Sequence, residues 1–197
     1  MDDRKKDDHA SRRAVTLGLG ATGLLTLPGL AYAQEDGAYS EPEVIGAANR
    51  FFGAGAEGLA DVVRHVFAQF GRPNGYIQGQ EASGAIGVGL RYGEGHLFFR
   101  HRSASTRVFW QGPSIGFDVG GDGAKCFTLV YGMRRTDQIF QRFPGVEGSA
   151  YYVGGVGVNY QRADNITLAP IRFGVGFRLG ANVGYLAYSR RRRIVPF

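Results

Sequence analysis

The chain of 197 residues has one cysteine, Cys126, and therefore cannot form an intramolecular disulfide. Cys126 lies in an apolar run with the alternation of a β-strand, which favours a buried, inert thiol over a catalytic nucleophile. Stability must then come from a packed core, and the chain is long enough for one domain with such a core.

Lysine is scarce as well, and the charge is unevenly spread. Residues 1–33 carry five of the 23 basic and four of the 17 acidic side chains, so 18 basic and 13 acidic residues follow. Lys125 is the only lysine among them, and residues 190–193 are all arginine. Without that run the remainder is nearly neutral, which argues against a nucleic-acid-binding domain with a broad basic patch. The run itself either is solvated or contacts phosphates of anionic lipid or lipopolysaccharide.

Residue patterns for metal, nucleotide and nucleophile sites are also missing. His96 and His101 are five residues apart, on opposite faces of an extended chain, and no second histidine lies at helical spacing from His65. The glycine-rich stretch 120–123 is followed by a strand pattern, so it lacks the helix of a phosphate loop, and it has too few carboxylates for calcium. Ser114 lies in an expected turn, which gives a serine nucleophile no support. We therefore expect no cofactor, no metal and no enzymatic activity.

The N-terminus has the features of an export signal. A charged lead and the Ser-Arg-Arg sequence at 11–13 precede an apolar run at 15–30 and the small-x-small motif at 31–33. The apolar run is shorter than the roughly 20 residues of a membrane span, which favours a cleaved signal over an anchor. The paired arginines resemble a twin-arginine signal, with an ordinary basic segment as the alternative. We predict cleavage between Ala33 and Gln34 and a periplasmic location.

After a flexible lead-in at 34–39, a single domain is expected over 40–197. Ser40 is followed three residues later by Glu43, the pattern of a capping box, so a helix is predicted to begin there. It continues to about Phe52, where Gly53 and Gly55 end it. A second amphipathic helix is predicted over 58–70, where apolar residues recur at i, i+3, i+4 and i+7. Each helix must bury one apolar face against another layer.

From residue 76 onward the apolar pattern has a period of two. Strands are predicted at 85–92, 106–111, 114–119, 126–131, 151–160, 166–168, 171–179 and 183–188, with a short helical stretch at 135–142. Turns are expected at 91–95, 110–114 and 120–123. The fold class is mainly β, an antiparallel, glycine-rich small β-barrel of about eight to ten strands with two N-terminal helices.

Glycine repeats at alternate positions within 86–90, 154–158 and 172–177. In each segment these glycines share one face of the predicted strand, with large apolar residues on the other. Because glycine weakens a strand, its repetition needs a reason. Three explanations remain open: another element packs directly on that face, a small barrel bends sharply there, or a lipid chain or glycan lies against the sheet.

Six residues are candidates for ligand contacts or structural polar pairs: Asp118, Trp110, Arg91, Glu94, Arg172 and Arg178. Glu94 lies in an expected turn, where we expect it to pair with a nearby arginine. Trp110 is placed to pack over an open barrel end. Asp118 is an acid among apolar strand residues, so we hypothesise a buried ion pair between Asp118 and either Arg172 or Arg178.

Several long motifs resemble those of a known family. The stretches 71–77 (GRPNGYI), 89–95 (GLRYGEG), 110–118 (WQGPSIGFD) and 181–186 (ANVGYL) are similar to the EipA family, and the resemblance covers nearly all of the chain after residue 33. It implies a periplasmic protein of alphaproteobacteria with a small conical β-barrel and a role in envelope integrity and stress resistance, genetically tied to lipopolysaccharide and peptidoglycan. It implies no catalytic residues. The glycine-rich strands around Trp110 are also similar, more weakly, to the lipid-binding SYLF domain.

Two functional hypotheses follow. In the first, the protein is a periplasmic, non-enzymatic module that maintains the cell envelope by binding an envelope lipid such as lipopolysaccharide, a glycan such as a peptidoglycan component, or an envelope protein. In the second, it is a hydrolase or transferase of envelope polymers, with a site assembled from scattered residues. A long apolar cavity along the glycine faces would favour lipid binding, whereas a cleft with convergent, perturbed acids would favour the enzyme.

Overall fold

The computed structural model describes residues 37–53, 57–85, 88–115, 118–146, 149–173 and 184–193, apart from the side chains within 83–89 and 114–123. The chain divides into residues 1–34 and 35–197, and all of the described residues belong to the second unit. The expected signal sequence therefore lies outside the described residues, and its cleavage stays a prediction.

Two helices, α1 (Glu41–Phe52) and α2 (Leu59–Phe70), open the described part of the chain, as the sequence predicted. The backbone N–H and the hydroxyl of Ser40 each donate to the carboxylate of Glu43 at 2.7 Å. These hydrogen bonds lower the pKa of Glu43 to about 2. The start of α1 is therefore fixed by the capping interaction that the Ser40–Glu43 spacing indicates.

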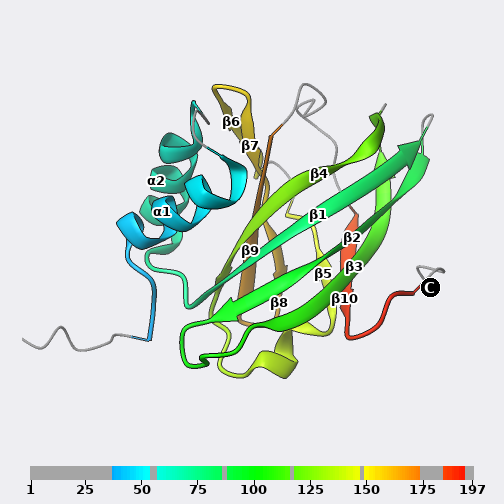
Figure 1. Cartoon of the computed structure of the whole chain (residues 1–197). Helices are drawn as coiled ribbons and strands as arrows, with labels where there is room; N and C mark the ends of the chain where they lie inside the picture. Colours follow the sequence, from blue (N-terminus) through cyan, green and yellow to red (C-terminus); the bar gives the residue numbers. More distant parts are fainter. Residues whose placement is uncertain are drawn as a thin grey trace, which may run out of the picture. The chain divides into compact units, whose positions relative to one another are not determined.

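The rest of the described fold is one antiparallel sheet (Figure 1). Its strands are β1 (Gly75–Ala85), β2 (Val88–Phe99), β3 (Thr106–Ile115), β4 (Asp118–Tyr131), β5 (Arg142–Pro144), β6 (Tyr151–Val153), β7 (Val156–Val158), β8 (Gln161–Ala163), β9 (Ile166–Phe173) and β10 (Tyr185–Ser189). A 3-10 helix, η1 (Thr136–Ile139), precedes β5 and lies within the helical stretch that was predicted.

The strand order is β5-β10-β3-β2-β1-β4-β9-β7-β6, and β8 pairs with β9 beside β7. An isolated bridge between Gly145, which follows β5, and Gln161 in β8 joins the first strand of this order to the far side of the sheet. The sheet thus curls back on itself as a half-barrel (Figure 1). The predicted fold class, mainly antiparallel β with two N-terminal helices, is confirmed.

The central strands are longer than the sequence pattern predicted. The turns expected at 91–95, 110–114 and 120–123 are wrong, because these residues lie inside β2, β3 and β4, which are 12, 10 and 14 residues long. Glycine suggested turns at these places, but within a long strand it also permits bends and bulges. The β1–β4 ladder has such a register shift, between Glu81 and Ser83.

Three strand predictions also need correction, because each predicted segment contains the end of one strand and the start of the next. The strand predicted at 85–92 contains the end of β1 and the start of β2, and the one at 114–119 contains the end of β3 and the start of β4. In the segment 151–160, Gly154 and Gly155 have positive φ values of 56° and 79° and form the turn between β6 and β7. Two successive residues with φ > 0 are typical of a tight hairpin turn, so these glycines serve the turn and not a strand face.

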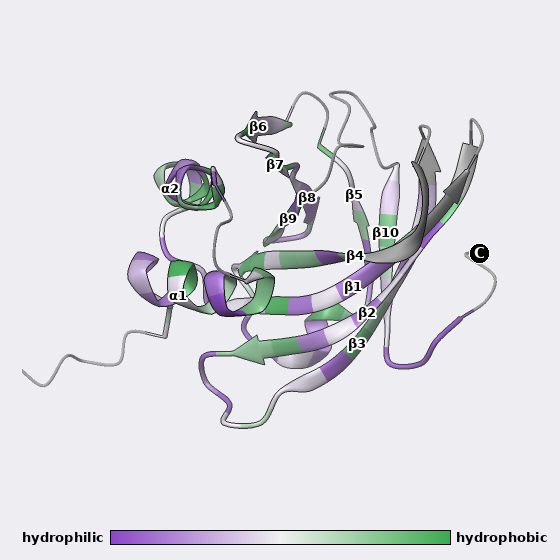
Figure 2. Ribbon diagram, turned by 45° about the horizontal axis from the view of Figure 1, so that its top comes forward, coloured by the Kyte–Doolittle hydropathy of each residue, from purple (hydrophilic) through white to green (hydrophobic). Residues whose placement is uncertain are grey.

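The two faces of the sheet pack against different apolar groups. Helices α1 and α2 cover one face, over strands β4, β7 and β9, with Val44, Val62, Val66, Phe127 and Ile171 among the buried residues. The other face lines the inside of the half-barrel and buries Ile77, Leu97, Trp110, Phe143 and Leu186 among others. Along β1, β2 and β3, hydrophobic residues are interspersed with hydrophilic ones (Figure 2).

A lysine joins the helical layer to the sheet. Nζ of Lys125, in β4, donates to the carbonyl oxygen of Phe51 at 2.8 Å, at the C-terminal end of α1. Its ammonium group also lies 5.6 Å from the centre of the Phe51 ring. A cation at this end of a helix satisfies carbonyl groups that have no partner within the helix. The helices leave the outer surface of β1, β2 and β3 uncovered beside this junction (Figure 2).

Candidate functional site

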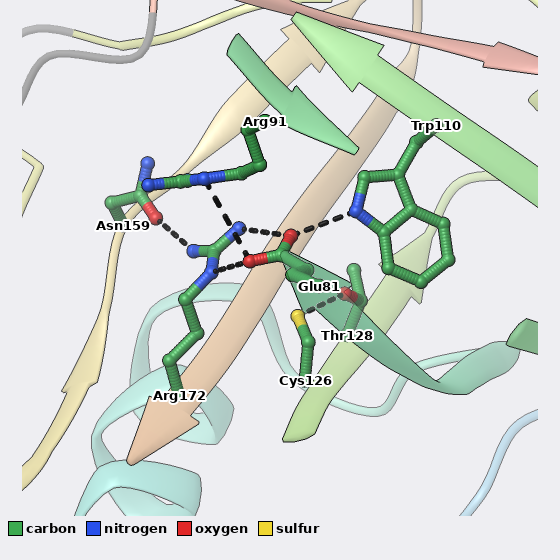
Figure 3. A network of polar contacts seen from close by, with 7 residues as sticks. All are labelled: Glu81, Arg91, Trp110, Cys126, Thr128, Asn159 and Arg172. Carbon is green, nitrogen blue, oxygen red and sulfur yellow. Dashed lines mark hydrogen bonds and ion pairs between the residues drawn. The ribbon is translucent and has the colours of Figure 1, made fainter. Parts of the chain in front are cut away.

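A buried carboxylate, Glu81, is the centre of a polar network inside the half-barrel (Figure 3). Nε and Nη2 of Arg172 donate to its two oxygens at 2.7 and 3.0 Å. The indole Nε1 of Trp110 donates to the Oε1 atom at 2.8 Å, and Nε of Arg91 lies 3.8 Å from Oε2. Glu81 and the two arginines are each less than 10% exposed, so this network is part of the interior.

The network keeps Glu81 charged. Burial alone would raise its pKa, but the charges of Arg172 and Arg91 and the hydrogen bonds from Arg172 and Trp110 lower the pKa of Glu81 to about 2. The pKa of Arg172 is raised, because the attraction of Glu81 outweighs burial. A third guanidinium atom, Nη1 of Arg172, donates to Oδ1 of Asn159 at 2.9 Å. The pair is therefore ionised and held by several hydrogen bonds.

The strand register brings these groups together from distant parts of the sequence. Cys126 in β4 pairs with Arg172 in β9 and with Gly79 in β1, two residues before Glu81. Gly93, in β2, pairs with Glu81 on one side and with Trp110 on the other. Five neighbouring strands, β3, β2, β1, β4 and β9, thus place an acid, an arginine and an indole at one level of the barrel interior.

Glycine makes room for the indole ring at this level. A Cβ atom on Gly93 would overlap the five-membered part of the Trp110 ring, and one on Gly79 would lie 2.5 Å from Cη2 of the same ring. Trp110 is 2% exposed and packs in the core, so the expectation that it covers an open barrel end is wrong. Direct packing on the strand face thus explains Gly79 and Gly93. The side-chain surroundings of the repeated glycines within 86–90 and 172–177 lie outside the described residues, so the three explanations stay untested for them.

The thiol of Cys126 lies beside this network and is inert. Its Sγ atom is 3.6 Å from Oγ1 of Thr128 (Figure 3). Burial, reinforced by the charge of Glu81, raises the pKa of Cys126 to about 12. A thiol with so high a pKa carries almost no thiolate at neutral pH, in agreement with the predicted structural role.

Three of the six candidate residues meet at Glu81: Trp110, Arg91 and Arg172. The carboxylate that Arg172 contacts among the described residues is Glu81, which the sequence analysis did not single out. Asp118 pairs with Ala85 in the β1–β4 ladder, but its side chain lies outside the described residues, as does all of Arg178. The hypothesis that Asp118 pairs with an arginine therefore stays untested.

The fourth described candidate, Glu94, lies on the outer surface. Its Oε2 atom is 3.3 Å from Nη2 of Arg107, in the neighbouring strand, and 3.1 Å from Nη2 of Arg192, beyond the end of β10. The hydrogen bonds from Arg192 and Arg107 lower the pKa of Glu94. The predicted pairing of Glu94 with arginine is confirmed, although it occurs in the middle of a strand.

Two adjoining cavities, of about 390 and 340 Å³, are both lined by Gln80 and Glu94. We call them the outer groove. Their lining combines aromatic side chains with polar and charged ones, chiefly Phe51, Tyr92, Phe98 and Phe109 with Gln78, Gln80, Glu94, His96, Arg107 and Arg192. The larger cavity also reaches Glu81 and Trp110. The outer groove is thus an open surface that offers both flat apolar faces and hydrogen-bonding groups.

Two chemical arrangements can be checked against this geometry. The stretch 112–116 (GPSIG) has the Gly-x-Ser-x-Gly spacing of a nucleophile elbow, which needs a sharp turn from a strand into a helix. Here Ser114 lies within β3 and pairs with Gly89 of β2, so that turn is missing. Within the described part of the chain, no group of three or more His, Cys, Asp or Glu residues is arranged to hold a metal ion.

Together the fold and the buried network define a β-barrel-like protein with two N-terminal helices. The chain belongs to the EipA family, because the family model for envelope integrity protein A matches residues 37–197. It is also similar to a solved crystal structure of a beta-barrel-like, uncharacterized protein from Brucella abortus, at 45% sequence identity and a TM-score of 0.75. That match covers 82% of this chain and 99% of the other. No curated protein matches the chain.

The comparisons confirm the family resemblance that the motifs indicated, and with it a connection to the cell envelope. No helix among the described residues is long and apolar enough to cross a membrane.

Proposed function

We propose that this protein is a periplasmic, non-enzymatic module that maintains the cell envelope by binding an envelope glycan along the outer groove. The family supports the envelope role, and the export-type N-terminus of the sequence supports the periplasmic location. The observation that carries the glycan proposal is the lining of the groove, where aromatic faces alternate with amide, carboxylate and guanidinium groups.

A glycan strand presents apolar ring faces and many hydroxyl groups. Half-buried aromatic side chains such as Phe98 and Phe109 can pack against sugar rings, while the exposed amide of Gln80 can both donate to and accept from hydroxyl groups. Arg107 lies over the Phe109 ring, 5.0 Å from its centre, so its donors are already held at the groove.

A lipid chain inside the half-barrel fits the described residues less well. At the level of Gly79 and Gly93 the inner face is filled by the Trp110 ring, and the polar network of Glu81 lies next to it. An apolar chain at that level would displace a buried hydrogen-bonded ion pair, at a high cost in free energy. A ligand in the outer groove would leave this ion pair in place.

The acids of the groove favour binding over hydrolysis. Glycoside hydrolysis needs one carboxyl group whose pKa is raised, so that it can protonate the leaving group. The pKa values of Glu81 and Glu94, the two acids in the lining, are both lowered, because each is paired with arginine. We therefore propose that the groove binds its ligand without cleaving it.

Co-sedimentation of the protein with purified peptidoglycan sacculi tests the proposal. The polysaccharide part of lipopolysaccharide is tested as a second ligand. The chain offers a matched pair of variants: Gln80→Ala with His96→Ala changes the groove, and Gln69→Ala with His65→Ala removes the same residue types from α2. We expect the groove variant to lose binding and the helix variant to keep it. Failure of the wild type to bind either glycan, or equal binding by both variants, would contradict the proposal. Release of soluble fragments from the sacculi would support the hydrolase instead.

A further inference from the structure

A further cavity, of about 430 Å³, is lined by arginines from three separate segments of the chain. Its lining includes Arg102 from the connection after β2, Arg134 and Arg135 from the segment before η1, and Arg190 from the end of β10. His101 also contributes to the lining. We call this cavity the arginine pocket. It shares no lining residue with the outer groove.

The positive charge of the arginine pocket is largely uncompensated. Its lining has one carboxylate, Asp137, and that group already pairs with Arg135 through two contacts of 3.2 Å. Within the described ranges, no carboxylate lies at ion-pair distance from Arg102, Arg134 or Arg190. Four guanidinium groups thus face one aspartate, an arrangement that attracts an anion from solution.

Contacts around the pocket hold the backbone of Arg134 and Arg135 and the side chain of Arg190. The side-chain oxygen Oε1 of Gln138 accepts hydrogen bonds from the backbone N–H groups of Arg134 and Arg135, at 2.8 and 2.9 Å. The guanidinium of Arg190 lies over the ring of Phe140, 4.2 Å from its centre. These contacts reduce the conformational freedom that the site would lose when an anion binds.

We propose that the arginine pocket binds phosphate groups, independently of the glycan-binding function proposed for the outer groove. A planar guanidinium donates two parallel hydrogen bonds to phosphate oxygens, and it remains charged throughout the physiological pH range. The ring of His101, in the same lining, adds a further nitrogen that can donate a hydrogen bond to a phosphate oxygen. The phosphate can come from a soluble anion or from a lipid headgroup.

The test measures binding of pyrophosphate by calorimetry and binding of vesicles by sedimentation, both at low ionic strength. One vesicle preparation contains anionic phosphatidylglycerol in phosphatidylcholine, and the reference preparation contains phosphatidylcholine alone. The pocket variant carries Arg134→Gln and Arg190→Gln. The control variant carries Arg50→Gln and Arg64→Gln on the helices, which removes the same charge. Circular dichroism establishes that both variants are folded.

We expect the pocket variant to bind the phosphate ligand about tenfold more weakly or worse, and the control to bind like the wild type. Binding of pyrophosphate supports the site and indicates a soluble ligand, whereas binding of the anionic vesicles alone supports it and indicates a lipid headgroup. Absence of both, or equal weakening in the two variants, would overturn the proposal. The Gln80→Ala, His96→Ala protein should retain full phosphate binding even if glycan binding fails.

Discussion

Glu81 and Arg172, which are 91 positions apart in the sequence, form a doubly hydrogen-bonded ion pair in the interior of the half-barrel. The pair connects β1 with β9, two strands that lie on either side of β4. Because both groups are buried, the pair is a condition for the native arrangement of these strands rather than an optional surface contact. The first predictions concern this pair.

Removal of the Glu81 charge should strongly destabilise the protein. Glu81→Gln keeps the shape of the side chain but leaves the buried guanidinium of Arg172 without a counter-charge, which costs about 3–5 kcal/mol. Urea denaturation measures the free energy of unfolding. The control is Glu57→Gln, at an exposed residue before α2, and it should change stability by less than about 0.5 kcal/mol. A Glu81→Gln protein as stable as this control would show that the pair contributes nothing.

The same pair predicts how stability depends on pH. The pKa of Glu81 is lower in the folded protein, about 2, than the value near 4.3 of an unfolded chain. Its contribution is therefore complete above the unfolded pKa and is lost as the pH falls from about 5 toward 2. We expect the stability difference between the wild type and Glu81→Gln to shrink over this interval. A difference that stays constant from pH 6 to pH 3 would contradict the assignment.

An added methyl group at Gly93 should disturb the core. The Cβ atom of Gly93→Ala would overlap the indole of Trp110, so either the ring or β2 must move, at a cost of about 1–3 kcal/mol. Tryptophan fluorescence should shift as well, because Trp110 is the single tryptophan of the chain. Gly184→Ala is the control, since its nearest neighbour would be Cγ of Pro113 at 3.7 Å, an ordinary contact. Similar effects of the two substitutions would refute the packing account.

Cys126 should be unreactive in the native protein. Its thiol is buried and has a pKa of about 12, so an aromatic disulfide reagent at pH 8 should modify it only as fast as the protein unfolds. In denaturant the same reagent should modify one thiol per chain immediately. Rapid modification of the folded protein would mean that Cys126 is accessible to solvent.

Local sequence patterns predicted the two helices correctly but did not predict the buried polar network around Glu81. The spacing of Ser40 and Glu43 is a contact within one helical turn, so the sequence contains both partners side by side. Glu81 has no such signal, because the residues before it, from Gln78 to Gln80, give β1 no clear apolar alternation. Its partner Arg172 comes from a distant strand, and pairing of that kind depends on the register of the whole sheet.

The turn predictions were wrong for a related reason. Glycine near Arg91 and Trp110 resembles a loop signal, yet in the structure it allows a long strand to pass closely over the ring of Trp110. The two uses of glycine differ only in what packs against the backbone, and this is decided by tertiary contacts. The outer groove combines residues of three strands, α1 and the segment after β10, so it could not be read from any single motif.

Complementation of a strain that lacks this gene tests the central claim most directly, with survival in detergent and in cell-wall antibiotics as the measurement. We predict that deletion lowers survival and that the wild type and the Gln69→Ala, His65→Ala protein restore it. At equal protein levels, the Gln80→Ala, His96→Ala protein should not. Normal survival of the deletion strain, or full restoration by the Gln80→Ala, His96→Ala protein, would contradict an envelope role for the outer groove.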